Sequence, residues 1–490
     1  MIDKIKVRTR STAAIGVFAF NLVLVGCEAG PAPAERAPAA AAKVETAAPA
    51  PPGATAETAG ACAEATREGG ALRWFHDDYP AALACARSKS LPLMIDMWAP
   101  WCHTCLSMQA YVLTDERLAD YDRRFVFLGL DTDREANAEV VAKFPPAAWP
   151  TFFAVSSTDE SIQSRFVGAA TVEQFAQFLE DGERGHQAAQ GGQLAAHEAA
   201  AREGDRAASD KRWSEAMQAY ERALTAAPRD WPRGADVMVS LLAAHVKGKQ
   251  WAVCPAVVRA YLDRTGKAAS ATDFGAHALQ CAREQSDPAT AAALRESVVA
   301  RLRGLVDDAA APMSVDDRSD ALLYLREGLD ALARPDDARA AATQQRRLLD
   351  EAAVKTTAPR IAMTYNWPRA EVYTYLGVGL ELVPALEQSV KDLPAEYDPP
   401  YRLAWIHLQA GKTEQAQRWA EQAITLAYGP RKAKAQAMLA EIHHARADVD
   451  GERAARTAAL ATLQGLPLPA QNPDAIAKAK AELDAVGKAK

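Results

Sequence analysis

The pattern of hydrophobic and polar positions changes character near residue 185. Before it, short apolar runs of strand length alternate with segments of helix length, and the run at 125–131 is continuously apolar, as in a central strand covered on both faces. After residue 195, small and apolar residues recur at helical spacing almost to the end of the chain. The pattern therefore predicts a multidomain protein, with an α/β domain at 67–184 and an all-α region at 195–465.

The α/β domain should consist of helices and strands that alternate around one sheet. We predict helices at 79–88, 102–112, 135–144 and 171–179, and strands at 91–98, 125–131, 149–155 and 162–167. The later strands should pair antiparallel, with 162–167 at the edge of the sheet. A polar linker at 185–194 should follow the last helix of this domain.

Residues 195–465 contain repeated helix pairs. The first pair has small residues, an aromatic residue and a helix-ending proline at the spacing of a tetratricopeptide repeat, at Gly204, Ala216, Tyr220, Ala223 and Pro228. The spacing returns between 403 and 423, and small residues at these positions let two antiparallel helices approach closely. We expect a tetratricopeptide-like solenoid of about six helix pairs, followed by a polar tail at 466–490. An irregular helical bundle is the alternative.

The N-terminal residues 1–26 have the pattern of a secretory signal. Basic residues precede an apolar run at 13–25 that is too short for a stable membrane span. The run ends in Leu-Val-Gly-Cys at 24–27, which resembles the bacterial lipobox, and this resemblance implies that Cys27 carries a lipid. An ordinary signal with a chance cysteine is the alternative.

Residues 27–66 are mostly Ala, Pro, Glu and Thr and contain almost no large apolar side chains, so they cannot bury enough surface to fold alone. We interpret them as a disordered tether. Its proline content should keep it semi-extended, which would hold the folded part on the order of 100 Å from a membrane. The expected location is the cell envelope, anchored by lipid and facing the periplasm, on the outer membrane if the source is Gram-negative.

A candidate redox site lies where the predicted strand 91–98 meets the next helix. Asp96 interrupts the apolar run, and Cys102 and Cys105 form a Cys-x-x-Cys pair at the start of the helix. The amides of a helix N-terminus stabilise a thiolate, so Cys102 should be the nucleophile and Cys105 the resolving thiol. A desolvated Asp96 should have a raised pKa, which suits it to take the proton from Cys105 through water. His103 should favour the thiolate when protonated, or it points to solvent.

A structural zinc half-site is the competing interpretation of the Cys-x-x-Cys pair. Such a site needs a second Cys or His pair at metal-ligand spacing, and the sequence offers only the isolated pair His443 and His444. We therefore expect neither a metal ion nor a cofactor.

Asp96, the motif at 101–105 and a proline about 45 residues later, Pro150, together resemble the pattern of thioredoxin-fold proteins, most closely the periplasmic thioredoxin domains of DsbD-type thiol reductases. The resemblance implies a cis Pro150 that faces the dithiol. It also implies substrate contacts by Trp101, His103, Trp149 and Pro150. Trp149 departs from the family, which usually has a smaller residue before this proline, and its bulk bears on the range of substrates.

Four other cysteines follow Cys27: Cys62 near the end of the predicted tether, and Cys85, Cys254 and Cys281 in the predicted folded part. Cys254 and Cys281 fall on consecutive helices of neighbouring repeats, which pack together in a solenoid, so we predict a structural disulfide between them. By elimination Cys62 pairs with Cys85, closing a loop worth about 3 kcal/mol. Buried free thiols are the alternative for this second pair.

The expected function follows from the motif and the repeats. A chain of 490 residues with a net charge of −7 has no basic surface for nucleic acid. We expect an envelope-anchored thiol-disulfide oxidoreductase that acts on protein disulfides, with a protein partner on the repeats. DsbD-like resemblance favours reduction, which needs a membrane electron donor, whereas His103 favours oxidation or isomerisation. The alternatives are a scaffold lipoprotein whose thioredoxin-like domain is accessory, and a narrower role in keeping apocytochrome cysteines reduced.

Overall fold

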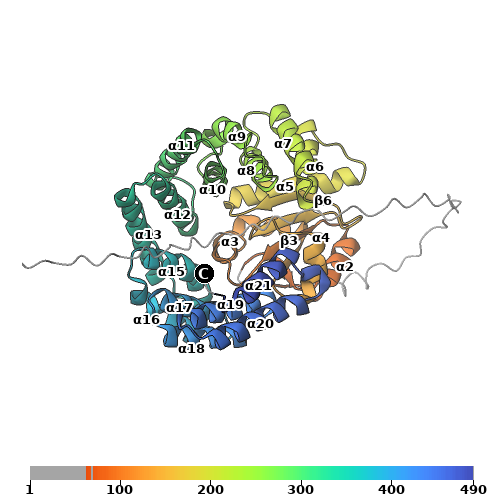
Figure 1. Ribbon diagram of the computed structural model, residues 1–490. Helices are drawn as coiled ribbons and strands as arrows, with labels where there is room; N and C mark the ends of the chain where they lie inside the picture. Colours follow the sequence, from red (N-terminus) through yellow and green to blue (C-terminus); the bar gives the residue numbers. More distant parts are fainter. Residues whose placement is uncertain (1–61, 68–69, 489–490) are drawn as a thin grey trace, which may run out of the picture.

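The computed structural model describes residues 62–67 and 70–488. It consists of an α/β domain and a long helical region, shown in Figure 1 from orange to yellow and from yellow-green to blue. The predicted fold class is therefore confirmed. The predicted signal, Cys27 and most of the predicted tether lie outside the described residues, and in the part that is described no helix is long and apolar enough to cross a membrane.

The sheet of the α/β domain has six strands in the order β1-β2-β4-β3-β5-β6. They are β1 (Thr66–Arg67), β2 (Arg73–His76), β3 (Leu93–Trp98), β4 (Val126–Asp131), β5 (Thr151–Val155) and β6 (Ile162–Val167). The central strands β3 and β4 pair parallel, whereas β5 pairs antiparallel with β3 and with β6. The predicted antiparallel later strands are confirmed. The short strands β1 and β2 were not predicted, and β1 extends the folded domain into the predicted tether.

Helices cover both faces of this sheet. They are α2 (Tyr79–Lys89), α3 (His103–Tyr111), η1 (Glu116–Arg123), η2 (Glu135–Asn137), α4 (Ala138–Lys143) and α5 (Val172–Ala189). Neighbouring residues of each strand alternate between two apolar clusters: Met94, Phe127 and Phe152 face one side, and Ile95, Leu128 and Phe153 face the other. The sheet therefore forms the centre of a three-layer domain and holds the end of β3 rigidly.

Helix α5 is longer than predicted. It continues through the expected linker to Ala189, and His186 is buried with its Nδ1 3.3 Å from the hydroxyl oxygen of Ser156. Gly182, which lies between the predicted end of this helix and the predicted linker, makes a close contact with the sheet, because a Cβ there would lie 2.3 Å from the Cβ of Ala154. The glycine lets α5 pack tightly on the sheet, so the linker shrinks to a turn before α6.

The helical region contains a series of helices that pack against their neighbours in the chain, as in an α-solenoid. Its helices are α6 (Ala196–Ser209), α7 (Trp213–Ala226), α8 (Gly234–Lys247), α9 (Cys254–Tyr261), η3 (Leu262–Arg264), α10 (Ala269–Arg283), α11 (Pro288–Asp307), α12 (Val315–Ala331), α13 (Pro335–Lys355), α14 (Pro359–Ala362), η4 (Met363–Tyr365), α15 (Asn366–Tyr375), η5 (Gly379–Leu382), α16 (Val383–Asp392), α17 (Asp398–Gln409), α18 (Thr413–Leu426), α19 (Gly429–Ala445), α20 (Val449–Gly465), η6 (Leu468–Ala470) and α21 (Pro473–Ala485).

The described part of the predicted polar tail, residues 466–488, contains the helix α21. Asn472 accepts hydrogen bonds from the first turn of α21, and this helix packs on α20, where Arg456 pairs with Glu482 at 3.1 Å. Its side chains are mostly exposed, which is why the sequence lacks an apolar stripe there. The expectation of a polar segment describes its surface correctly but misses the helix.

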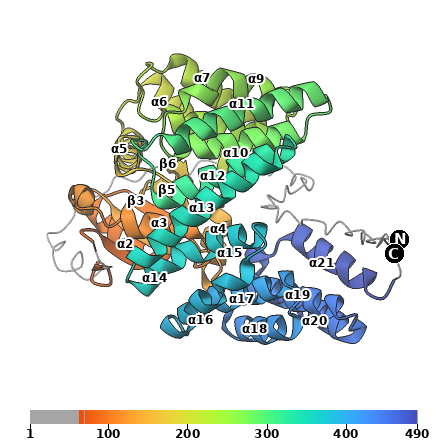
Figure 2. The ribbon, with the colours of Figure 1, turned by 90° about the vertical axis from the view of Figure 1, so that its left-hand side faces the viewer.

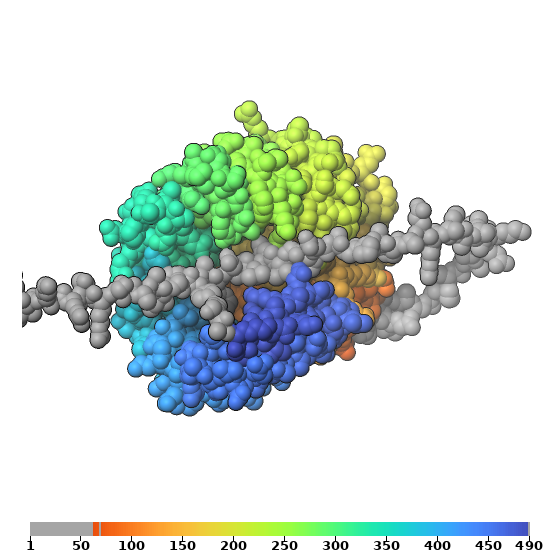
Figure 3. Space-filling view, viewed as in Figure 1, coloured from red at the N-terminus to blue at the C-terminus, as the bar shows by residue number. Residues whose placement is uncertain are grey.

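The helical region curves around the α/β domain and contacts it at several places. Figure 1 shows the arc, Figure 2 shows α12 and α14 beside α3, and in Figure 3 the orange surface of the α/β domain lies between the green and blue arms. Helix α6 lies along β6, α12 and α14 lie against α3, and η6 lies against α4. This arrangement encloses the end of β3 and the start of α3.

The β6 edge of the sheet is closed by the helical region. The backbone amide of Arg165 on β6 donates a hydrogen bond to Asp205 of α6 at 3.1 Å, so an otherwise open strand edge is covered by a side chain. The sequence placed this strand correctly at the edge but did not indicate what covers it.

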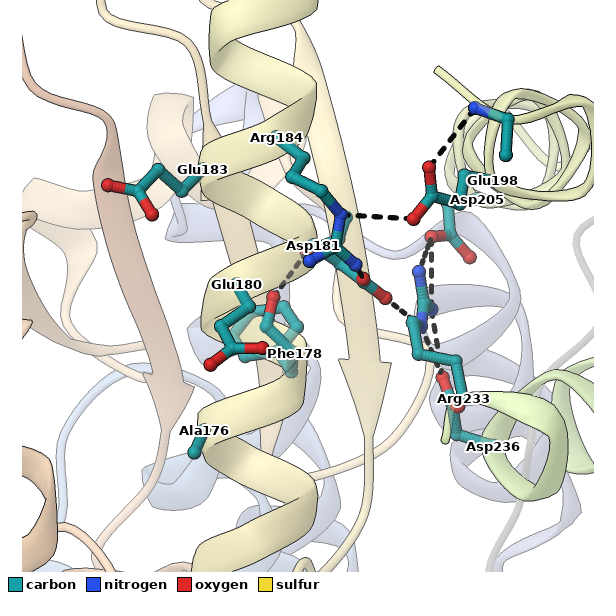
Figure 4. A network of polar contacts seen from close by, with 12 residues as sticks. Ala176, Phe178, Glu180, Asp181, Glu183, Arg184, Glu198, Asp205, Arg233 and Asp236 are labelled. Carbon is teal, nitrogen blue, oxygen red and sulfur yellow. Dashed lines mark hydrogen bonds and ion pairs between the residues drawn. The ribbon is translucent and has the colours of Figure 1, made fainter. Parts of the chain in front are cut away.

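A buried charge network fixes α5, α6 and α8 to one another (Figure 4). Arg233 lies 2.8 Å from Asp236, 3.3 Å from Asp181 and 3.4 Å from Asp205, and also donates to the carbonyl oxygen of Arg165. All four side chains are less than 10% exposed. We call Asp181, Asp205, Arg233 and Asp236 the Arg233 junction.

Candidate active site

Cys102 and Cys105 lie where β3 leads into α3 and are joined by a disulfide bond. Cys102 is the N-cap of α3, and the backbone amide of Cys105 donates to its sulfur at 3.0 Å. A thiolate at this position would accept the same hydrogen bond and lie at the positive end of the helix dipole. The geometry therefore matches the roles predicted for the two cysteines, with Cys102 as the more stabilised thiolate.

The dithiol is almost completely enclosed. Cys102 is 4% exposed and Cys105 is 1% exposed, and Trp98, Trp101 and Trp149 pack around them. The rings of Trp101 and Trp149 meet edge to face at 5.3 Å between centroids. A partner disulfide cannot reach Cys102 without movement of one or more of these groups.

The Trp149–Pro150 peptide bond is cis, as the thioredoxin resemblance implied. The indole nitrogen of Trp149 donates to the hydroxyl oxygen of Thr132 at 2.8 Å, which holds the ring against the loop after β4. Its ring belongs to the same apolar cluster as Cys102 and Cys105. The bulky residue before the proline thus forms part of the wall around the dithiol.

Asp96 lies in the middle of β3, paired in register with Gly129 of β4 and Phe152 of β5. It is 2% exposed, and one carboxylate oxygen, Oδ1, has no hydrogen-bond partner in the described part of the chain. Burial raises the pKa of Asp96 to about 7, against the opposing effect of a hydrogen bond with Gln109. A carboxyl group with a pKa near neutral can both take and return a proton, as the predicted role requires.

His103 does not point to solvent. Its Nδ1 lies 2.8 Å from a carboxylate oxygen of Asp316, which projects from α12 and is itself buried. Burial opposes the charge of the imidazole, but Asp316 and Asp320 outweigh it and raise the pKa of His103 to about 9. His103 is therefore protonated at neutral pH and carries a positive charge beside the two cysteines.

Trp101 is held by a residue from the far end of the chain. Its indole nitrogen donates to Asp133 at 2.7 Å, and the guanidinium of Arg431, at the start of α19, lies 3.5 Å from the centre of its ring. Arg431 also pairs with Asp133 at 3.4 Å. On the other side of the motif, Arg360 lies over the ring of Trp98.

The start of α19 touches the loop after β4 directly. Tyr428 donates its hydroxyl hydrogen to Asp131, and Gly429 has φ of 52° beside the carbonyl oxygen of Asp133. A Cβ on Gly429 would lie 1.9 Å from that oxygen, so only glycine fits the contact. We call the contacts of His103 with Asp316, Trp101 with Arg431, and Asp131 with Tyr428 the active-site seam.

Sequence reasoning missed the partners on the helical side of the seam. Asp316 contacts a residue 213 positions earlier, and nothing in the spacing of either segment indicates the pairing. The acidic stretch at 316–317 had a local explanation, because Asp317 caps the start of α12 together with Ser314. Only a conspicuous glycine at 429 and an arginine two residues later mark the other contact.

The other two disulfides lie away from the helix N-terminus that carries the motif. Cys254 at the start of α9 is bonded to Cys281 of α10, and Cys62 is bonded to Cys85 of α2. Cys254 and Cys281 are fully buried in the helical core. These are the two pairings expected from the sequence, and the alternative of free thiols does not describe either pair.

His443 and His444 do not form a zinc site with the dithiol. Each pairs with an acid at the start of the next helix, α20. His443 lies 2.8 Å from the N-cap residue Asp448, and His444 lies 2.9 Å from Glu452 in the first turn. Neither belongs to a group of ligand-type side chains close enough to hold a metal among residues 62–67 and 70–488.

Comparison with known proteins assigns the α/β segment to a class. A family model described as thioredoxin-like matches residues 74–153, which run from β2 to β5 and include the cysteine motif and the cis proline. No curated protein matches the chain. The protein therefore contains a thioredoxin-like domain with a Cys-x-x-Cys pair, joined to a helical region that surrounds it.

Proposed function

We propose that the protein is a thiol-disulfide oxidoreductase that acts on disulfides of protein substrates. The observation that carries this proposal is the Cys102–Cys105 pair at the N-terminus of α3, in a segment that matches the thioredoxin-like family. The buried, high-pKa carboxyl of Asp96 supports it, because exchange requires the second thiol to lose its proton.

In the reductive direction the reaction has two exchange steps. The Cys102 thiolate attacks one sulfur of the substrate disulfide, and the other substrate sulfur leaves as a thiolate that takes up a proton. Cys105 then transfers its proton to Asp96 through water and attacks the Cys102 sulfur, which releases the second substrate thiol. Two electrons pass from the dithiol to the substrate, so a separate donor at the membrane must reduce the Cys102–Cys105 disulfide again.

Reduction is the direction that we propose, on the DsbD-like pattern of the motif. Oxidation is the second candidate, because one observation favours it. His103 is held in its charged form by Asp316, and a positive charge beside Cys102 stabilises the thiolate and hence the reduced protein. Measurement of the reduction potential separates the two: a value near that of thioredoxin supports reduction, and a value near that of strong oxidants such as DsbA supports oxidation.

The helical region is proposed to select the protein partner. It contributes Arg431 and Arg360 to the surroundings of the two tryptophans beside the dithiol, so a substrate must displace or contact these groups to reach Cys102. A scaffold role is the competing proposal, and the 4% exposure of Cys102 favours it, since an enclosed dithiol can serve as a structural crosslink.

Reduction of insulin disulfides by the full chain and by Cys102→Ser, with dithiothreitol as electron donor, tests the catalytic proposal. The wild type should accelerate insulin precipitation and Cys102→Ser should not exceed the background rate. Equal rates for both proteins would leave the scaffold role as the better account. Cys254→Ser is the matched control, because it removes a sulfur far from the motif and should retain activity.

Envelope anchoring through Cys27 is part of the proposal, with the tether between lipid and folded domain. The two structural disulfides support it, because such bonds persist in oxidising compartments. Fractionation of cells that express the wild type or Cys27→Ser is the test: the wild type should appear with the membranes and the variant should not. Membrane association of both would contradict lipidation at this cysteine.

A further inference from the structure

Three side chains of metal-ligand type converge where the active-site helix meets the helical region. They are His103 of α3 and Asp316 and Asp320 of α12, and one ligand atom of each lies within 4.8 Å of the others. Asp316 and Asp320 are four residues apart, so one turn of α12 presents both on the same face. The three residues therefore come from both sides of the active-site seam.

Asp316 has an unused oxygen at this place. Its Oδ1 accepts from His103, but its Oδ2 is buried and has no hydrogen-bond partner among the residues that the structure describes. The side chain is 1% exposed, so bulk solvent does not satisfy this oxygen. Buried carboxylate oxygens normally have a partner, and an unmatched one indicates a missing ion or water.

The surroundings are rich in carboxyl groups, and burial together with their mutual repulsion raises the pKa of Asp273, Asp317 and Asp320. Asp317 on the same helix and Asp273 on α10 interact electrostatically with this group. No Lys or Arg in the described ranges forms an ion pair with Asp316 or Asp320, and the nearby Arg402 is paired with Asp398 at 2.6 Å. A cation of higher charge than one imidazolium would balance this cluster better.

We infer that His103, Asp316 and Asp320 bind a divalent transition-metal ion. Ligand atoms about 2.1 Å from a metal lie roughly 3.0 to 3.4 Å apart, close to the 2.8 Å between His103 Nδ1 and Asp316 Oδ1. One oxygen of Asp320 lies within 4.8 Å of the other two ligand atoms, so a shift of this side chain would have to bring it to ligand distance. One imidazole with two carboxylates suits Zn²⁺ or a similar first-row ion, with a fourth position left for water.

A metal at this site would connect α3 to α12. Binding would displace the proton that lies between His103 Nδ1 and Asp316, because only a neutral imidazole nitrogen is a metal ligand. The ion would then hold the active-site seam closed with three ligand bonds in place of one hydrogen-bonded ion pair, and its own charge would keep a positive charge beside Cys102. The predicted effect is a more stable enclosure of the dithiol in the presence of the metal.

Calorimetric titration of the untagged, oxidised full chain with Zn²⁺ tests the site. The Cys102–Cys105 disulfide keeps the thiols from competing as ligands. The wild type should bind one Zn²⁺ with saturation, and Asp320→Asn should weaken binding at least about 100-fold, because loss of a second-shell partner alone costs 10- to 100-fold. Asp317→Asn is the matched control, since it removes the same charge one residue from Asp316 but lies outside the triad, and should change the affinity by less than about tenfold.

Absorption of the Co²⁺-loaded wild type gives a second readout. A site of nitrogen and oxygen ligands should show visible bands without the near-ultraviolet band of thiolate ligation, and Asp320→Asn should lose these bands while keeping a native circular dichroism spectrum. No saturable Zn²⁺ binding, or equal affinity in wild type and Asp320→Asn, would overturn the site. Insulin reduction does not enter either readout, so this test can fail while the proposed function stands.

Discussion

The helical region contacts the thioredoxin-like domain in two ways that differ in kind. At the Arg233 junction a guanidinium is surrounded by three carboxylates, all four side chains are nearly inaccessible, and every charge has an opposite partner. At the active-site seam the contacts are separate pairs at the surface of the motif, and the His103 and Arg431 side chains are 21% and 16% exposed. The first contact is one buried charge network, whereas the second consists of smaller and more exposed groups of contacts at several places.

This difference suggests which contacts would open if the buried dithiol is to meet a substrate disulfide, as the proposed function requires. The junction holds α5, α6 and α8 together beside β6 in the first part of the helical arc, whereas α19 lies in its last part (Figure 1). Opening of the seam would require the arm that carries α19 to move away from Trp101, and the contact of η6 with α4 on the same arm would have to yield as well. Under the proposed function, access to Cys102 would depend on residues of the helical region as well as on the tryptophans of the thioredoxin-like domain itself.

The largest effect is expected from breaking the Arg233 junction. Arg233→Met leaves three buried carboxylates without their common partner, and should lower the free energy of unfolding by about 3–5 kcal/mol. Urea unfolding followed by circular dichroism measures this loss. Arg222→Met, which removes an exposed pair with Glu203, is the control and should cost at most about 1 kcal/mol. Equal losses in the two variants would remove the distinction between the two contacts.

Asp96 provides the opposite case, a buried charge without a basic partner. Its pKa in the folded protein, about 7, lies above its usual value, so the folded state binds more protons and the free energy of unfolding falls as the pH rises from about 4 to about 7. Asp96→Asn removes this loss. Relative to the wild type, the variant should gain about 3 kcal/mol between pH 5 and pH 8 in urea unfolding. A constant difference between the two proteins across this range would contradict the raised pKa.

The disulfide between Cys254 and Cys281 should matter for stability and not for exchange. It closes a loop over a sequence separation of 27, and its loss in the double variant Cys254→Ser, Cys281→Ser should cost about 3 kcal/mol in the free energy of unfolding. The initial rate of insulin reduction below the unfolding temperature should stay within about twofold of the wild-type rate. A twofold change in rate corresponds to a change in activation free energy of RT ln 2, which is well under 1 kcal/mol. A large loss of rate would show that this bond also supports the active site.

A smaller effect on stability, but a clear one on access, is expected at the seam. Arg431→Ala removes the cation over the ring of Trp101 and the ion pair with Asp133. Together these contacts should favour the closed seam over the open one by about 1–2 kcal/mol. Alkylation of reduced Cys102 by iodoacetamide should become roughly five- to thirtyfold faster. Lys432→Ala, the exposed neighbour, is the control and should react at the wild-type rate. An unchanged rate in Arg431→Ala would mean that the seam does not limit access.

Sequence reasoning found the features whose residues lie close together in the sequence or on strands with a clear apolar pattern. Asp96, Cys102 and Cys105 lie within ten residues, and the strand that brings Pro150 back to them has its own apolar pattern. Asp316 and Arg431 could not be found in this way, because their partners are set by how the helical arc closes on the domain. The end of α5 was predicted too early for a related reason: a glycine such as Gly182, which permits close packing, is indistinguishable in sequence from one that ends a helix.

The central claim is that Cys102 attacks substrate disulfides behind a seam that opens. The most direct test is to incubate the reduced Cys105→Ser variant with oxidised insulin and locate the trapped adduct by mass spectrometry of unreduced peptides. Without the resolving thiol, a mixed disulfide should accumulate on Cys102, and Arg431→Ala in the same background should accelerate its formation. Absence of any adduct on Cys102, with the variant folded and its thiol reduced, would contradict the account.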